Sequence, residues 1–138
     1  MSTNAPADPR PLSPHLQVWR FHLTMVASIM HRVTGVALYF GTFLITAWLF
    51  TLGLPMSGGE PPESFTFLQG LMTSIFGQIV LTLWAGVVLF HFANGIRHLL
   101  WDGPRIGFDP KTASTWSLFN FVFAAAGAMG IWFAVTQI

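Results

Sequence analysis

The sequence predicts an all-α membrane protein with three transmembrane helices. Apolar residues make up 53% of the 138-residue chain and charged residues only 8%, whereas an average globular chain is roughly 25% charged. The mean hydropathy is +0.60. A single domain of this length cannot bury so much apolar surface in a water-soluble core. We therefore expect lipid to cover the rest.

A spanning helix needs about 20 mostly apolar residues. Three stretches reach that length and predict spans at about residues 25–54, 74–100 and 114–137. A polar, proline-rich segment, 1–22, precedes the first span. We expect one transmembrane domain that covers residues 1–138. The two connections are rich in proline and glycine, which is typical of turns and loops.

The second apolar stretch, Phe65 to Leu100, is longer than one span requires. Its first dozen residues surround Gln69 and Gly70 and lie before Phe76, where the span proper is expected to begin. The excess length favours a separate surface helix ahead of that span.

Lysine and arginine predict the orientation, because cytoplasmic segments are enriched in them. The basic residues lie before or at the start of the first span and around the second connection: Arg10, Arg20, Arg32, Arg97, Arg105 and Lys111. The first connection carries only Glu60 and Glu63. The pattern predicts a cytoplasmic N-terminus and a periplasmic C-terminus.

Composition excludes several classes of protein. A net charge of +1 without a basic run gives no indication of nucleic-acid binding. The lack of cysteine excludes disulfides, cysteine-ligated iron–sulfur clusters and thiolate zinc sites within this chain. The N-terminus resembles neither a secretory signal nor a transit peptide, since it carries Asp8 and its first arginine is Arg10. These features favour a bacterial inner membrane over a mitochondrial one.

Two groups of polar residues lie inside the predicted spans, where polar side chains are costly and often mark a function. In SIMHR, Ser28, His31 and Arg32 are spaced i, i+3 and i+4 and share a helix face. In HFANGIRHLLWD, the spacing i, i+3 and i+7 predicts a shared face for three residues: His91, Asn94 and His98. Both groups are expected near the cytoplasmic side of the membrane.

Depth separates His91 from the others. It precedes Arg97 by six residues, which is roughly 9 Å along a helix, so it is expected inside the hydrocarbon, whereas Arg97 is expected to extend to the interface. A neutral imidazole at that depth needs partners for its ring nitrogens. The alternatives are a purely structural role, a haem axial ligand, a proton relay and a metal ligand. The spans contain no carboxylate, which disfavours a dedicated metal site or an ion-coupled transporter.

Each of the other residues also has a structural interpretation. Arg32 and Arg97 are compatible with topology anchors alone, and Ser28 with a hydrogen bond to the carbonyl one turn earlier. His31 and His98 are compatible with hydrated positions at the interface. Residue types and spacing leave these alternatives open.

Three segments in order resemble the cytochrome b anchor subunit of succinate dehydrogenase. They are RPLSPHL at 10–16, SIMHRVTG at 28–35 and HFANGIRHLLWD at 91–102. The resemblance implies a subunit of respiratory complex II that is not catalytic alone, with a flavoprotein, an iron–sulfur subunit and a second, smaller anchor as partners. It implies electron transfer from succinate to ubiquinone.

The resemblance also implies roles for individual residues. His91 matches the axial ligand of haem b, with the opposite ligand from the second anchor. Ser28 and Arg32 match the quinone-site serine and arginine. The remaining haem contacts implied, to the propionates or close to them, are His31, Arg32, Arg97 and His98.

Two rival functions remain at this level. One is the anchor of a quinol:fumarate reductase, which differs in the direction of catalysis. The other is a non-redox membrane scaffold, in which the polar residues only pack helices. Small residues on the third span, such as Ala126 and Gly130, suit helix packing in either case.

Overall fold

The structure is a computed structural model that describes residues 19–52 and 60–137. The predicted all-α class is confirmed, because the described residues form four helices: α1 (Leu23–Leu52), α2 (Glu63–Thr73), α3 (Ile75–Asp102) and α4 (Pro110–Thr136). By length and composition, α1, α3 and α4 can each cross a membrane. Arg10 and the RPLSPHL segment lie outside the described residues.

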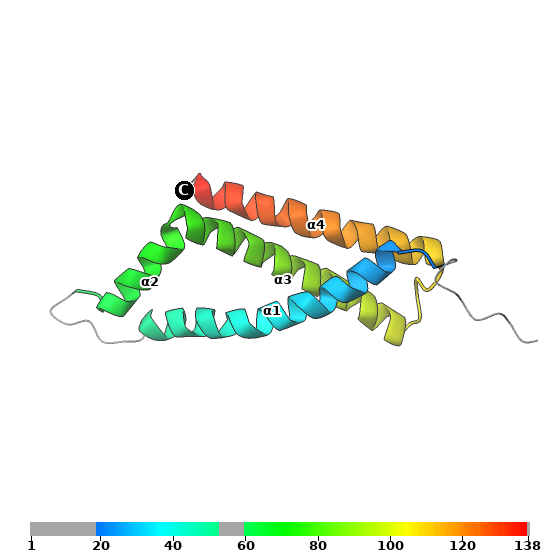
Figure 1. The fold of residues 1–138 in the computed structure, drawn as a ribbon, viewed down its shortest axis with the longest axis horizontal. Coiled ribbons are helices and arrows are strands. Elements are labelled where there is room, and N and C mark those ends of the chain that lie inside the picture. Colours follow the sequence, from blue (N-terminus) through cyan, green and yellow to red (C-terminus); the bar gives the residue numbers. More distant parts are fainter. Residues whose placement is uncertain (1–18, 53–59, 138) are drawn as a thin grey trace, which may run out of the picture.

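The three long helices alternate in direction (Figure 1). α1 and α4 begin at one end of the molecule, and α3 runs back toward it. α1 crosses α3, whereas α3 and α4 lie side by side, so α3 contacts both of the other long helices. α2 lies at the opposite end and connects α1 to α3 (Figure 1).

α2 is the separate helix predicted ahead of the second span. Ser74 ends α2 and begins α3, and its side chain accepts a hydrogen bond from the Gly77 backbone N–H at 3.1 Å. A Cβ at Gly77 would lie 2.2 Å from the Leu71 carbonyl oxygen. The corner between the two helices is therefore tight enough to require glycine at this position.

α4 begins at Pro110, ahead of residue 114, where the apolar span is expected to start. Asp109 caps the helix by accepting hydrogen bonds from the backbone N–H groups of Lys111 and Thr112 at 3.1 and 3.2 Å. A side-chain hydrogen bond with Thr112, together with the backbone N–H bonds, lowers the pKa of Asp109. Proline fits the first turn, where its missing N–H leaves no helix bond unmade.

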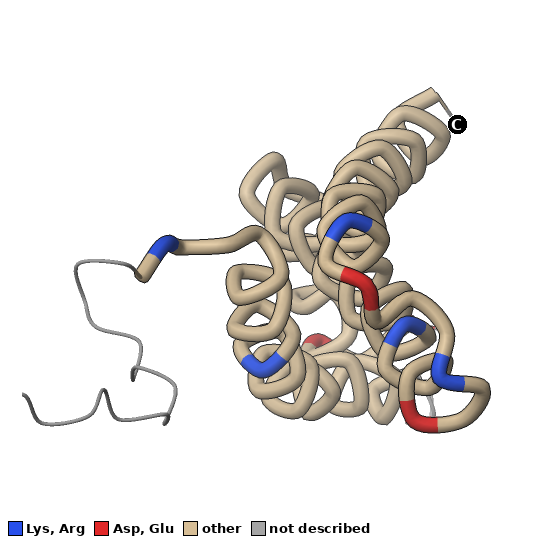
Figure 2. The backbone as a smooth tube through the Cα atoms, turned by 90° about the vertical axis from the view of Figure 1, so that its right-hand side faces the viewer, with Lys and Arg blue, Asp and Glu red and all other residues tan. Residues whose placement is uncertain are grey.

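Charged residues lie mainly at one end of the molecule, where α1 and α4 begin and α3 ends (Figure 2). The described basic residues there are Arg20, Arg32, Arg97, Arg105 and Lys111. We call this the basic end. The helix directions thus gather the described cations, and the cytoplasmic placement of this end stays a prediction.

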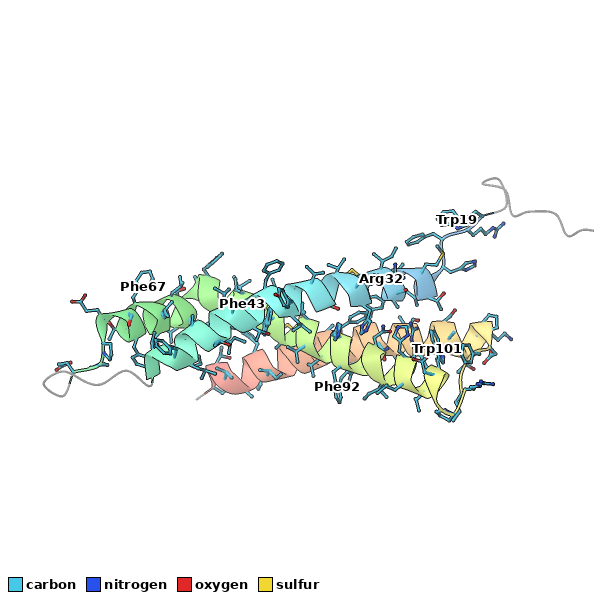
Figure 3. The ribbon with its side chains drawn as sticks, turned by 90° about the horizontal axis from the view of Figure 1, so that it is seen from below. Trp19, Arg32, Phe43, Phe67, Phe92 and Trp101 are labelled. Carbon is cyan, nitrogen blue, oxygen red and sulfur yellow. The ribbon has the colours of Figure 1, made fainter. Side chains whose placement is uncertain are left out.

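Most large apolar side chains point away from the neighbouring helices, among them Phe43, Phe67 and Phe92 (Figure 3). α4 instead packs through small and polar residues: Ala113, Ser117, Asn120, Ala124 and Ala128. Ala126 and Gly130 are exposed, and a Cβ at Gly130 would meet nothing within 4 Å. The expectation that these two residues pack helices is therefore wrong within this chain.

Candidate functional site at the crossing of α1 and α3

Glycines allow α1 and α3 to approach closely where they cross. A Cβ at Gly35 of α1 would lie 3.1 Å from Cε1 of His91 on α3. In return, a Cβ at Gly95 of α3 would lie 3.9 Å from Cε1 of His31 on α1. Each helix thus places a glycine against a histidine ring of the other helix, and a larger side chain at Gly35 would require the His91 ring to turn or the two helices to separate.

The crossing brings together three of the histidines singled out by the sequence: His31, His91 and His98. The rings of His31 and His91 stack, with centroids 4.0 Å apart and planes 16° apart. The His98 ring lies 5.1 Å from the His31 ring at 33°. All three side chains are half-buried. We call these three residues the histidine cluster.

Thr34 connects the two helices within the histidine cluster. Its hydroxyl donates a hydrogen bond to the His31 carbonyl oxygen at 2.9 Å. The same oxygen lies 3.1 Å from Nδ1 of His91. By contrast, Nδ1 of His31 is buried and has no hydrogen-bond partner among the described residues. The cluster therefore contains one imidazole that is held by a hydroxyl and one with an unpaired ring nitrogen.

Ser28 and Arg32 lie on α1 on either side of His31, as the spacing predicts. Ser28 is half-buried, and Arg32 is exposed near the basic end (Figure 3). The Ser28 hydroxyl makes no hydrogen bond to a described residue, the carbonyl one turn earlier included. Within the described part of the chain, both side chains remain available to a ligand.

Arg97 lies on the other side of α3, against α4. Only 2% of it is exposed. Its Nη1 donates hydrogen bonds to the Ser117 hydroxyl and, at 3.5 Å, to the Ala113 carbonyl oxygen. Its guanidinium also lies over the Trp101 ring, 4.5 Å from the centroid. α4 thus covers the Arg97 side chain, whose guanidinium meets Ala113 in the first turn of that helix. Its expected extension to the interface stays a prediction, and so does its proposed contact with haem.

Asn94 likewise faces α4 rather than the histidine cluster. It is fully buried, and its Oδ1 accepts a hydrogen bond from Nδ2 of Asn120 at 3.3 Å. By spacing, Asn94 lies about 60° round α3 from His91. The structure places it at the edge of that face, where it meets Asn120 of α4, whereas His91 meets α1. The expectation that Asn94 joins the histidines is therefore wrong.

Three polar residues of these interfaces were not singled out from the sequence: Thr34, Ser117 and Asn120. Thr34 lies three residues after His31, a spacing that puts both on neighbouring positions of one helix face. Ser117 and Asn120 are spaced i and i+3 within an otherwise apolar span. Such polar residues inside a span are a signal for interhelical hydrogen bonds.

The geometry restricts what the cluster can bind. Among the described residues, no group of three or more histidines, cysteines or carboxylates converges on a single metal ion. The stacked rings of His31 and His91 leave no room for a metal atom between them. Nε2 of His91 makes no hydrogen bond to a described residue. Nε2 of His91 is therefore available to a ligand within the described part of the chain.

The comparisons with known proteins agree with one another. The family model for the succinate dehydrogenase/fumarate reductase transmembrane subunit matches residues 6–131. The chain is similar to the succinate dehydrogenase cytochrome b556 subunit of Paracoccus denitrificans, with 42% identity over 95 residues that cover 67% of each chain. It is also similar to the subunit of that name in Rickettsia bellii (strain RML369-C), with 35% identity over 79% of this chain and 81% of the relative.

A mitochondrial protein shares the similarity. The chain is 36% identical over 96 residues to the succinate dehydrogenase cytochrome b560 subunit of Sus scrofa, over 67% of this chain and 53% of the relative. The matched region of the family model includes the histidine cluster, α1, α3 and most of α4. The chain therefore belongs to the family of succinate dehydrogenase/fumarate reductase transmembrane subunits and is a membrane anchor of that type.

Proposed function

We propose that this chain binds haem b together with a second, smaller anchor subunit and forms part of the site where ubiquinone is reduced. It would serve a complex that passes electrons from succinate to quinone in a bacterial inner membrane. The single observation that carries the proposal is the histidine cluster. It places the His91 imidazole of α3 against the Thr34 hydroxyl and against Gly35, both on α1.

The residues present fit a haem. His91 offers Nε2 as an axial ligand, and the unpaired Nδ1 of His31 can donate to or accept from an edge group of the porphyrin. Arg32 is exposed at the basic end and pairs with no described carboxylate, so its positive charge suits a propionate. A bound haem would supply one-electron transfer close to the quinone. We also propose that His98 and Arg97 contact the haem. Only the family resemblance supports these two contacts.

We infer that the second ligand comes from another chain. A second histidine that would hold the haem with His91 needs to lie apart from the His91 ring, whereas the His31 ring stacks directly on it. His98 lies beside His31, on the same side of the crossing. The second anchor subunit is the proposed source, and the exposed apolar faces of the long helices are where it and lipid would pack.

Ser28 and Arg32 are proposed to bind the quinone head group. A serine hydroxyl can donate to one quinone carbonyl oxygen. The neighbouring guanidinium stabilises the negative charge that develops on that oxygen when electrons arrive before protons. Both side chains lie on α1 near the basic end. A flavoprotein and an iron–sulfur subunit that dock on this end would bring the electron donor close to the quinone.

The first prediction tests the haem ligand. His91→Ala should abolish the b-type absorption band of the purified complex or shift it strongly, because the iron loses an axial nitrogen. His22→Ala is the matched control, since His22 is exposed just before α1 and lies outside the histidine cluster. A normal band in the His91 variant would exclude His91 as a ligand. A wild-type complex with neither a haem band nor quinone-dependent activity would favour a non-redox scaffold.

The second prediction tests the quinone site. Ser28→Ala and Arg32→Leu should each lower succinate:quinone activity by about tenfold or more, the effect typical of removing one stabilising donor. Succinate oxidation with an artificial dye should remain. Arg20→Leu, an exposed arginine before α1, serves as the control. An equal loss of both activities would indicate an assembly defect and contradict this assignment.

A further inference from the structure

We propose that Thr34 is a positioning residue that selects the Nδ1–H tautomer of His91 and thereby leaves Nε2 free to bind the haem iron. The inference rests on the proposed function, in which His91 is the axial ligand. It assigns a role to a side chain of α1 that touches neither the iron nor the quinone in the proposal.

The tautomer follows from counting hydrogen atoms. A threonine hydroxyl has one hydrogen and two lone pairs. Thr34 uses that hydrogen in its bond to the His31 carbonyl oxygen at 2.9 Å. The contact of 3.1 Å between the same oxygen and Nδ1 of His91 can then be a hydrogen bond only if Nδ1 donates. A neutral imidazole that carries its proton on Nδ1 has its lone pair on Nε2.

The hydroxyl cannot easily turn away from this arrangement. Thr34 is 3% exposed, so water does not compete for its oxygen. Its bond to the carbonyl three residues earlier fixes the hydroxyl, and the β-branched side chain has few rotamers in a helix. A hydroxyl that already donates to a carbonyl is also a better acceptor, because linked hydrogen bonds polarise one another.

The His91 ring is held on two further sides. The His31 ring stacks on one face of it at 4.0 Å. The open position at Gly35 lies against Cε1, between the two ring nitrogens. With Nδ1 bound to Thr34, these contacts fix the direction in which Nε2 points. The residue pair Thr34 and Gly35 therefore acts as a single surface that orients the imidazole.

A partner on the second ring nitrogen changes a metal site measurably. It fixes the ring orientation and raises the basicity of the ligating nitrogen, and its loss typically weakens metal binding about 10- to 100-fold. A more basic ligand stabilises the oxidised iron, so the Thr34 bond should lower the midpoint potential of the haem. Loss of the hydroxyl should raise that potential.

The test uses Thr34→Val, which keeps the branched shape and removes the hydroxyl, and Thr34→Ser, which keeps the hydroxyl. Haem retention and midpoint potential are measured on the purified whole complex. Thr34→Val should lose haem about 10- to 100-fold more readily and show a higher potential, while Thr34→Ser should stay close to wild type. A raised midpoint potential of the haem in Thr34→Val, together with a wild-type potential in Thr34→Ser, is a result that a purely structural role would not produce.

Thr51 provides a matched control. It lies on α1, is buried at 7% exposure and donates to the carbonyl three residues earlier, that of Trp48, at 2.6 Å. It has no histidine partner in the described structure. Thr51→Val should therefore leave haem retention and potential unchanged. An equal change in the Thr51 and Thr34 variants would overturn the inference, because general packing would then explain both.

The outcomes separate this inference from the proposed function. Suppose that His91→Ala removes the haem and Thr34→Val changes neither haem retention nor midpoint potential. The role assigned to Thr34 is then wrong, and the assignment of His91 as haem ligand is supported. If His91→Ala leaves the haem band normal, both are wrong. Should Thr34→Val fail to assemble, Thr34→Cys takes its place, since a thiol sulfur is only a weak acceptor. An unchanged potential in that variant also overturns the inference.

Discussion

The same hydrogen-bonding arrangement occurs on both sides of α3 and has a different consequence on each side. On the α1 side, the Thr34 hydroxyl donates to a carbonyl of its own helix and accepts from His91. On the α4 side, the Ser117 hydroxyl donates to the Ala113 carbonyl at 2.8 Å and accepts from Arg97. In each case a hydroxyl that already donates within its own helix presents its oxygen to a donor on α3.

The two interfaces differ in how accessible they are. Arg97, Ser117 and Asn94 are at most 2% exposed, whereas the histidine cluster is only half-buried. A polar group buried between two helices hydrogen-bonds within that interface and so helps to fix their packing. A half-buried group can meet a ligand or another subunit. Accessibility, more than residue type, distinguishes the side of α3 that is proposed to bind haem from the side that packs against α4.

The largest effect is expected on the α4 side. Ser117→Ala leaves a buried guanidinium short of one acceptor, and a hydrogen bond to a charged group contributes about 1.5–3 kcal/mol. Denaturation of the purified complex by SDS in mixed micelles should show a loss of that size, while the haem band stays unchanged. Ser114→Ala is the control, since Ser114 donates in the same way to the carbonyl four residues earlier, that of Pro110, but in a hydrogen bond that is exposed to solvent or lipid.

An altered haem spectrum with unchanged stability in the Ser117 variant would contradict the assignment of the α4 side of α3 to helix packing. It would make Arg97 part of the haem site, as the sequence resemblance implies, and Ser117 its support. A loss of stability in the Ser114 variant equal to that in the Ser117 variant would show that the bond within α4, and not the contact with Arg97, carries the effect.

Much of the fold could be predicted from the sequence, because lipid imposes simple rules. Long charge-free stretches predicted three long helices, and the excess length before Phe76 indicated α2. The spacing of His31 on one helix and of His91 and His98 on another placed them at the same level, and the structure brings their rings together. Depth along a helix is readable from residue number alone.

The rotation of each helix about its axis could not be predicted in the same way. Arg97 follows His91 by six residues, which brings it near the same end but onto the α4 side. Which side of α3 faces α4 depends on the small and polar residues of α4, and the sequence pattern does not state which helix they meet. For the same reason Thr34 was missed, since its importance comes from a partner 57 positions away.

A smaller effect is expected for the pair of amides on the α4 side. Asn94→Ala, Asn120→Ala and the double variant form a cycle that isolates their hydrogen bond of 3.3 Å. Such bonds in membrane proteins average about 0.6 kcal/mol and reach about 1.7. We expect a coupling energy in that range from SDS denaturation, with an unchanged haem potential in all three variants. Strict additivity of the two single changes would show that the amides do not interact.

The smallest effect on stability, and the sharpest contrast, is expected for the two glycines at the crossing of α1 and α3. At either position, replacing glycine by alanine should stabilise the helix by roughly 0.5–1 kcal/mol. At Gly95 the new methyl group lies at an ordinary contact distance from His31, 3.9 Å, so that gain should appear in full. At Gly35 it lies 3.1 Å from a His91 ring that Thr34 already holds, so crowding should cancel most of the gain.

The spectrum should separate the glycine variants more clearly than stability does. Gly35→Ala can be accommodated only by turning the His91 ring or by moving α1 away from α3, and either change alters the direction of Nε2. We therefore expect a shifted haem potential in the Gly35 variant and a wild-type potential in the Gly95 variant, by redox titration of the purified complexes. A shift of equal size in both would mean that the potential responds to helix spacing in general, and the orienting surface formed by Thr34 and Gly35 would lose its support.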